Sequence, residues 1–130
     1  MIEFTDVVKC YEQGNKALNG VTMQIDDGEF CFLVGPSGSG KSTIIKLITG
    51  ELRPTSGTVK VNGYALERIR KREIPLLRRT VGVVFQDFRL INNMTVYDNV
   101  AFAMRVIGAR EREIRDRVPY VLELVGLENK

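Results

Sequence analysis

Hydrophobic and polar residues alternate along parts of the first half of the chain, and this alternation predicts β-strands. The alternation is loose in the first predicted strand and cleaner in the second, which the turn signal Asp26-Asp27-Gly28 follows. A short third strand is predicted ahead of the strong turn pair Asn62-Gly63. The three predicted strands cover residues 2–8, 18–25 and 58–61. The pattern therefore predicts that residues 1–34 and 57–63 are mainly β-structure.

Two other segments are apolar without alternation. Residues 29–34 and 80–85 are compact apolar runs of the kind found in strands that a parallel sheet buries on both faces. We expect them to be two strands of one parallel core.

Helical spacing begins after the first of these runs. Residues 44–48 place apolar side chains on one stripe that ends at Gly50, and residues 96–107 and 110–125 also have helical spacing. In the last segment apolar residues recur at i, i+4, i+7, i+8 and i+11, namely Ile114, Val118, Val121, Leu122 and Val125. Pro119 interrupts this pattern and predicts a kink or a break. Strands and helices together predict an α/β fold.

The composition is ordinary for a globular chain, and it excludes kinds of catalytic and metal site mainly because one residue type, histidine, is missing. With 130 residues, 44% of them apolar and 27% charged, the chain predicts one soluble domain with a sizeable core. It has no histidine, which excludes a histidine base, a Ser-His-Asp or Cys-His pair and a histidine-ligated metal from these residues. Its apolar runs are too short to span a membrane. Cys10 and Cys31 are expected to be buried structural thiols in an intracellular protein.

Basic residues are dense between positions 67 and 79, although the net charge of the whole chain is only +3. This cluster lacks interleaved aromatic residues and matches no nucleic-acid-binding module. We therefore expect a solvated face or a rim contact, and no nucleic-acid partner.

The strongest chemical signal is Gly35-Pro-Ser-Gly-Ser-Gly-Lys-Ser42, which matches the phosphate-binding pattern G-x-x-x-x-G-K-[ST]. Its glycines let backbone N–H groups approach a phosphate, and the helix that follows adds aligned donors at its N-terminus. We expect Lys41 to reach the β- and γ-phosphates, Ser42 to ligate Mg²⁺ and Thr43 to donate toward the α-phosphate. The residues predicted to bind nucleotide here are Gly35, Pro36, Ser37, Gly38, Ser39, Gly40, Lys41, Ser42 and Thr43.

Three further features make the sequence similar to the ATP-binding-cassette (ABC) ATPases over its whole length. Tyr11 follows the first predicted strand, where this family places an aromatic ring against adenine. The segments Pro54-Thr-Ser-Gly57 and Val59-Lys-Val-Asn-Gly63 resemble part of the family's antiparallel subdomain. Gly82-Val-Val-Phe-Gln-Asp87 resembles its Q-loop, with Gln86 at the end of a core strand.

The resemblance implies ATP and Mg²⁺ as cofactors and an ATP hydrolase as the full-length enzyme. It implies catalytic roles for Lys41 and Gln86, and Mg²⁺ contacts from Ser42 and Gln86. The implied fold is an α/β P-loop NTPase with an N-terminal antiparallel β subdomain, cut within the helical subdomain. Its implied parts are β-structure at 1–34 and 57–63, P-loop and helix at 35–50, core strand and Q-loop at 80–90, and the start of the helical subdomain at 95–130.

Within the family, the sequence most resembles the members that act in bacterial cell division. The segments on which this resemblance rests are Ile74-Pro-Leu-Leu-Arg-Arg79, Phe85-Gln-Asp-Phe-Arg-Leu90, Thr95-Val-Tyr-Asp-Asn-Val-Ala-Phe-Ala103 and Val106-Ile-Gly108. They imply a homodimer bound peripherally at the cytoplasmic face of the membrane and paired with an integral membrane subunit (FtsX-like). Phe88, Leu90 and Tyr97 are then expected to dock that subunit, with ordinary core packing as the alternative.

Three other readings stay open at this point. They are an ATPase of a lipoprotein-release or macrolide-type exporter, a nucleotide-binding half-domain that does not hydrolyse, and a small P-loop kinase. The 130 residues hold no LSGGQ-type signature, Walker B aspartate with its glutamate, D-loop or switch histidine. The resemblance therefore implies an N-terminal half, and we expect these residues alone to be poorly stable and not to turn over ATP.

Overall fold

The computed structural model describes residues 1–12 and 14–129 of the chain, which forms two compact units, Met1–Gly82 and Val83–Lys130. In chain order the helices and strands are β1 (Ile2–Cys10), β2 (Lys16–Ile25), α1 (Lys41–Ile48), β3 (Ser56–Val61), β4 (Tyr64–Ala65), α2 (Ile74–Arg79), α3 (Val96–Val106) and α4 (Glu111–Leu124).

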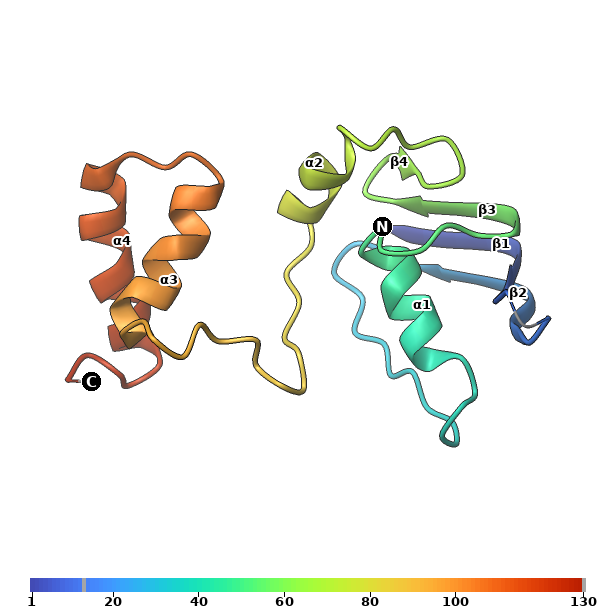
Figure 1. Ribbon diagram of the computed structural model, residues 1–130, viewed down its shortest axis with the longest axis horizontal. Coiled ribbons are helices and arrows are strands. Elements are labelled where there is room, and N and C mark those ends of the chain that lie inside the picture. The colour runs from blue at the N-terminus through green and yellow to red at the C-terminus, as the bar shows by residue number, and fades with distance from the viewer. Residues whose placement is uncertain (13, 130) are drawn as a thin grey trace. The chain divides into compact units, whose positions relative to one another are not determined.

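The first unit is built on a four-stranded antiparallel sheet in the order β2-β1-β3-β4 (Figure 1). β1 contains a bulge, because Asp6 has a φ of 48° and the register with β2 shifts between Phe4 and Val7. The bulge leaves Thr5 and Asp6 both exposed while Phe4 and Val7 are both buried. It therefore explains why alternation in the first predicted strand is loose.

Helix α1 packs against one face of this sheet (Figure 1). It contributes Ile44, Leu47 and Ile48 to the core of the first unit. The sheet contributes Phe4, Val7, Leu18, Val59 and Val61. Burying each such side chain stabilises the unit by about 1.5–3 kcal/mol. This packing holds the helix, and the loop before it, in a fixed position on the sheet.

The sequence pattern did not predict β4 or α2. β4 pairs with the end of β3 across the turn at Asn62-Gly63. α2 buries Leu77, which closes the same core together with Leu66 and Ile69. Basic residues are interspersed among the apolar residues of this segment, so its helical spacing is hard to recognise in the sequence. The basic side chains are exposed, as either a solvated face or a rim contact requires.

The prediction of strands at 29–34 and 80–85 was wrong. Neither segment forms a strand in the described part of the chain, and Phe30, Val34 and Val84 are 82%, 83% and 93% exposed. A strand buried on both faces needs hydrogen-bonding neighbours and a covering layer on each side. The described residues provide neither, so the two segments run beside solvent.

The second unit is a pair of helices, α3 and α4, around a small core of Ala101, Ile114, Val118 and Leu122. Thr95 caps α3 by accepting a hydrogen bond from the N–H of Asp98 (3.0 Å). The expected break at Pro119 is absent, because α4 is continuous from Glu111 to Leu124. Pro119 is exposed, and water can satisfy the carbonyl that loses its helical partner.

The expectation of two buried thiols was also incorrect. Cys10 is half-buried at the end of β1, and Cys31 is exposed because its segment is unpaired. Among the helices of the described residues, none has both the length and the apolar character needed to cross a bilayer.

Candidate nucleotide-binding site

The glycine-rich loop leads directly into α1, and the helix begins at Lys41, where the motif predicts it. Gly40 is the N-cap residue, with a φ of 94°, and no side chain of the described structure caps this helix end. Residues 35–39 are exposed. The first N–H groups of the helix are therefore accessible to an anion, which the helix dipole favours.

Two glycines are required by close approaches as well as by backbone angles. A Cβ on Gly40 would lie 2.6 Å from the carbonyl oxygen of Ala17 and 2.8 Å from Cδ2 of Leu18, both on β2. A Cβ on Gly35 would lie 2.7 Å from Oγ of Ser39 across the loop. The loop is thus packed tightly both on itself and against the sheet.

The Lys41 side chain folds back over the loop. Its Nζ donates hydrogen bonds to the carbonyl oxygens of Gly35 (2.7 Å) and Pro36 (2.6 Å) and lies 3.4 Å from Oγ of Ser39. The ammonium group is therefore held at the loop, where it adds a full positive charge to the partial charge of the helix end. This is the electrostatic arrangement that a polyphosphate requires.

Tyr11 and Thr43, which are far apart in the sequence, meet at this site. A hydrogen bond of 3.1 Å joins Oη of Tyr11 and Oγ1 of Thr43. Thr43 is only 5% exposed, whereas the neighbouring Ser42 is exposed and its hydroxyl is accessible. The structure thus brings Tyr11 to the first turn of α1. Adenine stacking by Tyr11 and an α-phosphate contact from Thr43 stay predictions.

An open hollow of about 540 Å³ lies beside the Tyr11 ring. Its lining residues are Lys9, Cys10, Tyr11, Glu12, Asn15 and Leu52. The Lys9 ammonium lies 6.0 Å from the centre of the Tyr11 ring. Sequence reasoning named only Tyr11 here, because no spacing rule brings the end of β1 next to Leu52.

The residues present fit a nucleoside triphosphate with Mg²⁺. The loop offers backbone donors, one ammonium group and the exposed hydroxyl of Ser42, but the described residues hold no cluster of three acidic or cysteine side chains for a metal. Mg²⁺ prefers to bind through phosphate oxygens, water and few protein ligands. Ser42 would hold the metal here, and the phosphates would complete its shell.

Gln86 belongs to the second unit, where it is exposed in a turn that follows the unpaired segment 80–85. Its expected position at the end of a formed core strand is therefore wrong for the described chain. Its catalytic and Mg²⁺-binding roles stay predictions.

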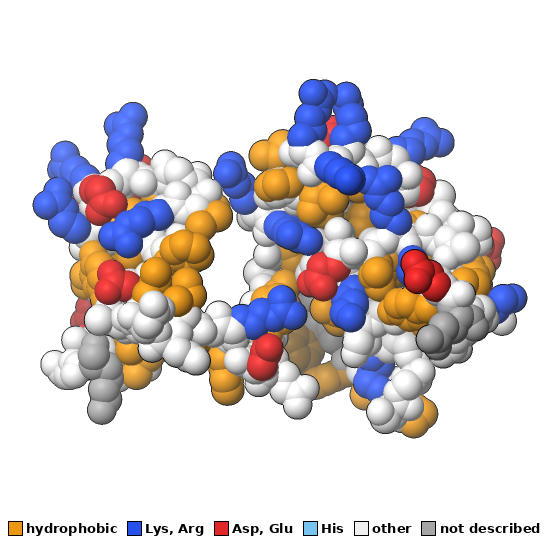
Figure 2. Space-filling view, in the orientation of Figure 1, with side chains coloured by type: hydrophobic (Ala, Val, Ile, Leu, Met, Phe, Trp, Pro, Cys, Tyr) orange, Lys and Arg blue, Asp and Glu red, His pale blue; other side chains and the backbone are white. Residues whose placement is uncertain are grey.

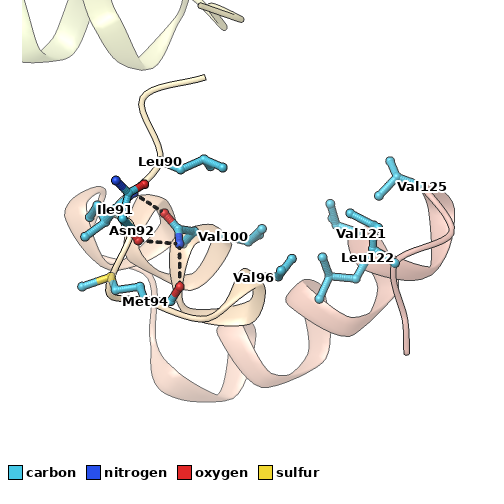
Figure 3. Close-up of a pocket in the computed structure, with 11 residues that line it drawn as sticks. Leu90, Ile91, Asn92, Met94, Val96, Val100, Val121, Leu122 and Val125 are labelled. Carbon is cyan, nitrogen blue, oxygen red and sulfur yellow. Dashed lines mark hydrogen bonds between the residues drawn. The ribbon is translucent and has the colours of Figure 1, made fainter. Parts of the chain in front are cut away.

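The second unit contains a groove of about 480 Å³ between the loop before α3 and the end of α4 (Figure 3). Its apolar lining comes mainly from Leu90, Ile91, Met94, Val96, Val100, Val121, Leu122, Val125 and Leu127. Asn99 fixes one wall, because its amide accepts the N–H of Ile91 (2.8 Å) and donates to the carbonyl of Thr95 (3.0 Å). Phe88 and Leu90 are exposed, whereas Tyr97 packs against the core of the unit.

An antiparallel sheet packed on a helix that opens from a glycine-rich, lysine-closed loop defines a phosphate-binding-loop protein of the ATP-binding-cassette type. A protein-family model described as ABC transporter matches residues 18–130. The chain therefore belongs to the ABC transporter family.

Curated relatives match the whole chain. The cell division ATP-binding protein FtsE of Bacillus subtilis is 52% identical over 130 residues, which cover 100% of this chain and 57% of that protein. FtsE of Streptococcus pneumoniae strain D39 is 51% identical, with 100% and 56% covered. A solved dimeric ATP-binding cassette in a post-hydrolysis state with bound ADP and Pi has a TM-score of 0.86 at 33% identity. That match covers 99% of this chain and 59% of the other. The chain thus spans less than two thirds of the length of these relatives.

Proposed function

We propose that this chain supplies the ATP-binding part of an ABC ATPase that acts in bacterial cell division. The observation that carries the proposal is the loop at residues 35–41, which closes around the Lys41 ammonium at the N-terminus of α1. The identity of about half of all residues to FtsE proteins supports the assignment to cell division.

Each residue of the site then has a defined task. Lys41 and the N–H groups of the loop bind the β- and γ-phosphates, and Ser42 holds Mg²⁺, which neutralises phosphate charge when bound. Tyr11 stacks on adenine from the end of β1. Gln86 would contact Mg²⁺ and the attacking water in the assembled enzyme.

The complete protein is proposed to work as a homodimer at the cytoplasmic face of the membrane, paired with an FtsX-like integral membrane subunit. The dimeric state of the solved cassette supports the first part. The exposed apolar groove around Leu90 and Val125 supports the second, because it provides a surface for a partner helix. Nucleotide binding at the first unit would be relayed to that groove through the Q-loop residue Gln86.

Residues 1–130 alone are proposed to bind ATP without turning it over. Phosphoryl transfer needs an oriented water as well as held phosphates, and these residues include no Walker B glutamate. Steady phosphate release by the 130-residue chain, abolished by Lys41→Ala, would contradict this.

The nucleotide site is tested by comparing Lys41→Ala with Lys46→Ala. Both lysines lie on α1, but Lys46 is exposed in the last turn of the helix, whereas Lys41 is its first residue and contacts the loop. Titration with a fluorescent ATP analogue is expected to show wild-type affinity for Lys46→Ala and a loss of at least tenfold for Lys41→Ala, because the ammonium contact to phosphate is charge-assisted. Equal affinities of the two variants would overturn the site.

The role in division is tested in cells that depend on a plasmid-borne copy of the complete gene. Cells with Lys41→Ala are expected to form filaments, whereas cells with Lys46→Ala divide normally. If cells with either variant divide normally, but cells with Lys41→Ala no longer export a lipoprotein or a drug, the protein would be assigned to an exporter instead.

A further inference from the structure

Basic side chains gather over the connection between β4 and α2, at the top of the view in Figure 2. Six exposed residues between positions 68 and 79 form what we call the basic surface: Arg68, Arg70, Lys71, Arg72, Arg78 and Arg79. The same stretch holds one acidic residue, Glu73, so its net charge is +5. Since the whole chain carries +3, all other residues together carry −2. Positive charge is therefore concentrated on one part of the first unit.

This charge is not neutralised within the unit. Glu73 accepts the backbone N–H of Arg70 (2.8 Å) and pairs with its side chain (3.4 Å). The hydrogen bond from the Arg70 backbone, and then the charges of Arg70 and Arg72, lower the pKa of Glu73. Among the described residues, no acidic side chain forms an ion pair with Lys71, Arg72 or Arg79. An external anionic partner therefore meets uncompensated charge.

The segment that carries the basic surface is anchored in the core of the first unit. Ile69 and Leu77 are buried in the core of the first unit, and Arg53 donates a hydrogen bond to the carbonyl of Ile69 (2.6 Å). Leu76 lies on α2 among the basic residues and is 45% exposed. An apolar side chain beside a basic cluster is typical of surfaces that contact lipid headgroups.

We propose that the basic surface binds the anionic headgroups of a phospholipid bilayer, with Leu76 entering the headgroup layer. Clusters of four to eight Lys and Arg residues suit such a surface. A single-stranded nucleic acid is the weaker fit, because the stretch from 68 to 79 contains no aromatic side chain to stack on a base. The contact goes beyond the proposed function, which assigns membrane attachment to a partner subunit, and it does not require ATP.

The test is co-sedimentation of the purified complete protein, without its membrane subunit, with phospholipid vesicles. Vesicles of phosphatidylcholine alone are compared with vesicles that also contain phosphatidylglycerol. The variant Lys71→Gln/Arg72→Gln is compared with Arg112→Gln/Arg115→Gln, which removes the same charge from exposed positions on α4. Circular dichroism confirms that each variant is folded, as expected for exposed sites.

Wild type is expected to bind only the phosphatidylglycerol vesicles, and less so at high salt. Each lost charge lowers the partition coefficient about fivefold, so the first variant binds about 25-fold more weakly, and the control variant keeps most of the binding. No binding, equal binding to both vesicles, or equal losses in the two variants would overturn the proposal. A protein that binds a DNA duplex in a parallel assay but binds neither kind of vesicle would also overturn the proposal. Lys41→Ala, which tests the nucleotide site, is expected to bind vesicles like wild type.

Discussion

A pair of alanine substitutions in the phosphate-binding loop tests how this loop is fixed to the sheet. Gly38 and Gly40 both have positive φ, 79° and 94°, so alanine is strained at either position. They differ in their surroundings: a Cβ on Gly38 would meet nothing within 4 Å, whereas one on Gly40 would collide with the backbone and a core side chain of β2. The comparison therefore separates backbone strain from the close approach.

The expected magnitudes follow from these geometries. Left-handed backbone costs an L-residue about 1–2 kcal/mol, and this term applies to both variants. Alanine also reduces the entropy of the unfolded chain, by about 0.4–1 kcal/mol, and this term cancels in the comparison. At Gly40 the carbonyl of Ala17 and the buried Leu18 must move, which adds about 1–3 kcal/mol, as in other overpacked cores. Gly40→Ala is thus expected to be the more destabilising variant by that margin.

Urea denaturation of the complete protein measures both free energies of unfolding, and nucleotide titration of the folded variants measures the effect on the site. Gly40→Ala is expected to lower the denaturation midpoint clearly more than Gly38→Ala, and to weaken nucleotide binding because the first turn of α1 shifts. Equal midpoints would refute the reasoning, since they would show that α1 does not begin within contact of β2.

Two further predictions concern one unit each. Leu47→Ala, at a fully buried position on α1, is expected to lower the free energy of unfolding by about 2–5 kcal/mol, while Ile45→Ala on the exposed side of the helix has a much smaller effect. Thermal denaturation checks the pair, and similar losses would contradict the placement of α1. Asn99→Ala is expected to cost about 1–3 kcal/mol by leaving the N–H of Ile91 without its partner. Hydrogen exchange at that amide should then accelerate, and an unchanged rate would show that Asn99 does not hold the loop.

The parts of the fold that the sequence predicted well are those determined by neighbours along the chain. The loop motif located the start of α1 at Lys41, because its glycines and its helix end are local features. The helical spacing of Ile114, Val118 and Leu122 correctly named the α4 face buried in the second core. Val125, from the same spacing, is 63% exposed, because it follows the last turn of the helix.

The parts that the sequence predicted poorly depend on contacts between distant residues. The bulge at Asp6 shifts the register of β1 with both of its neighbours, β2 and β3. The short strand β4 exists only because it pairs with the end of β3. The meeting of Tyr11 with Thr43 likewise depends on how the end of β1 passes α1. The candidate site could therefore be predicted at its phosphate end, whereas the structure was needed for the hollow beside Tyr11.

The unpaired run at 29–34 offers the last test of how the site is completed. Three of its side chains, Phe30, Phe32 and Val34, are about four-fifths exposed although the run leads directly into the phosphate-binding loop. Exposed apolar strand edges are prone to aggregation, so such a run is expected to be covered in the working enzyme. The relatives are longer than the region they share with this chain. We predict that amides 30–34 exchange slowly with solvent in the complete protein and quickly in the 130-residue chain. Fast exchange in both would show that this run stays exposed in the complete protein, and the expectation that further residues cover it would be refuted.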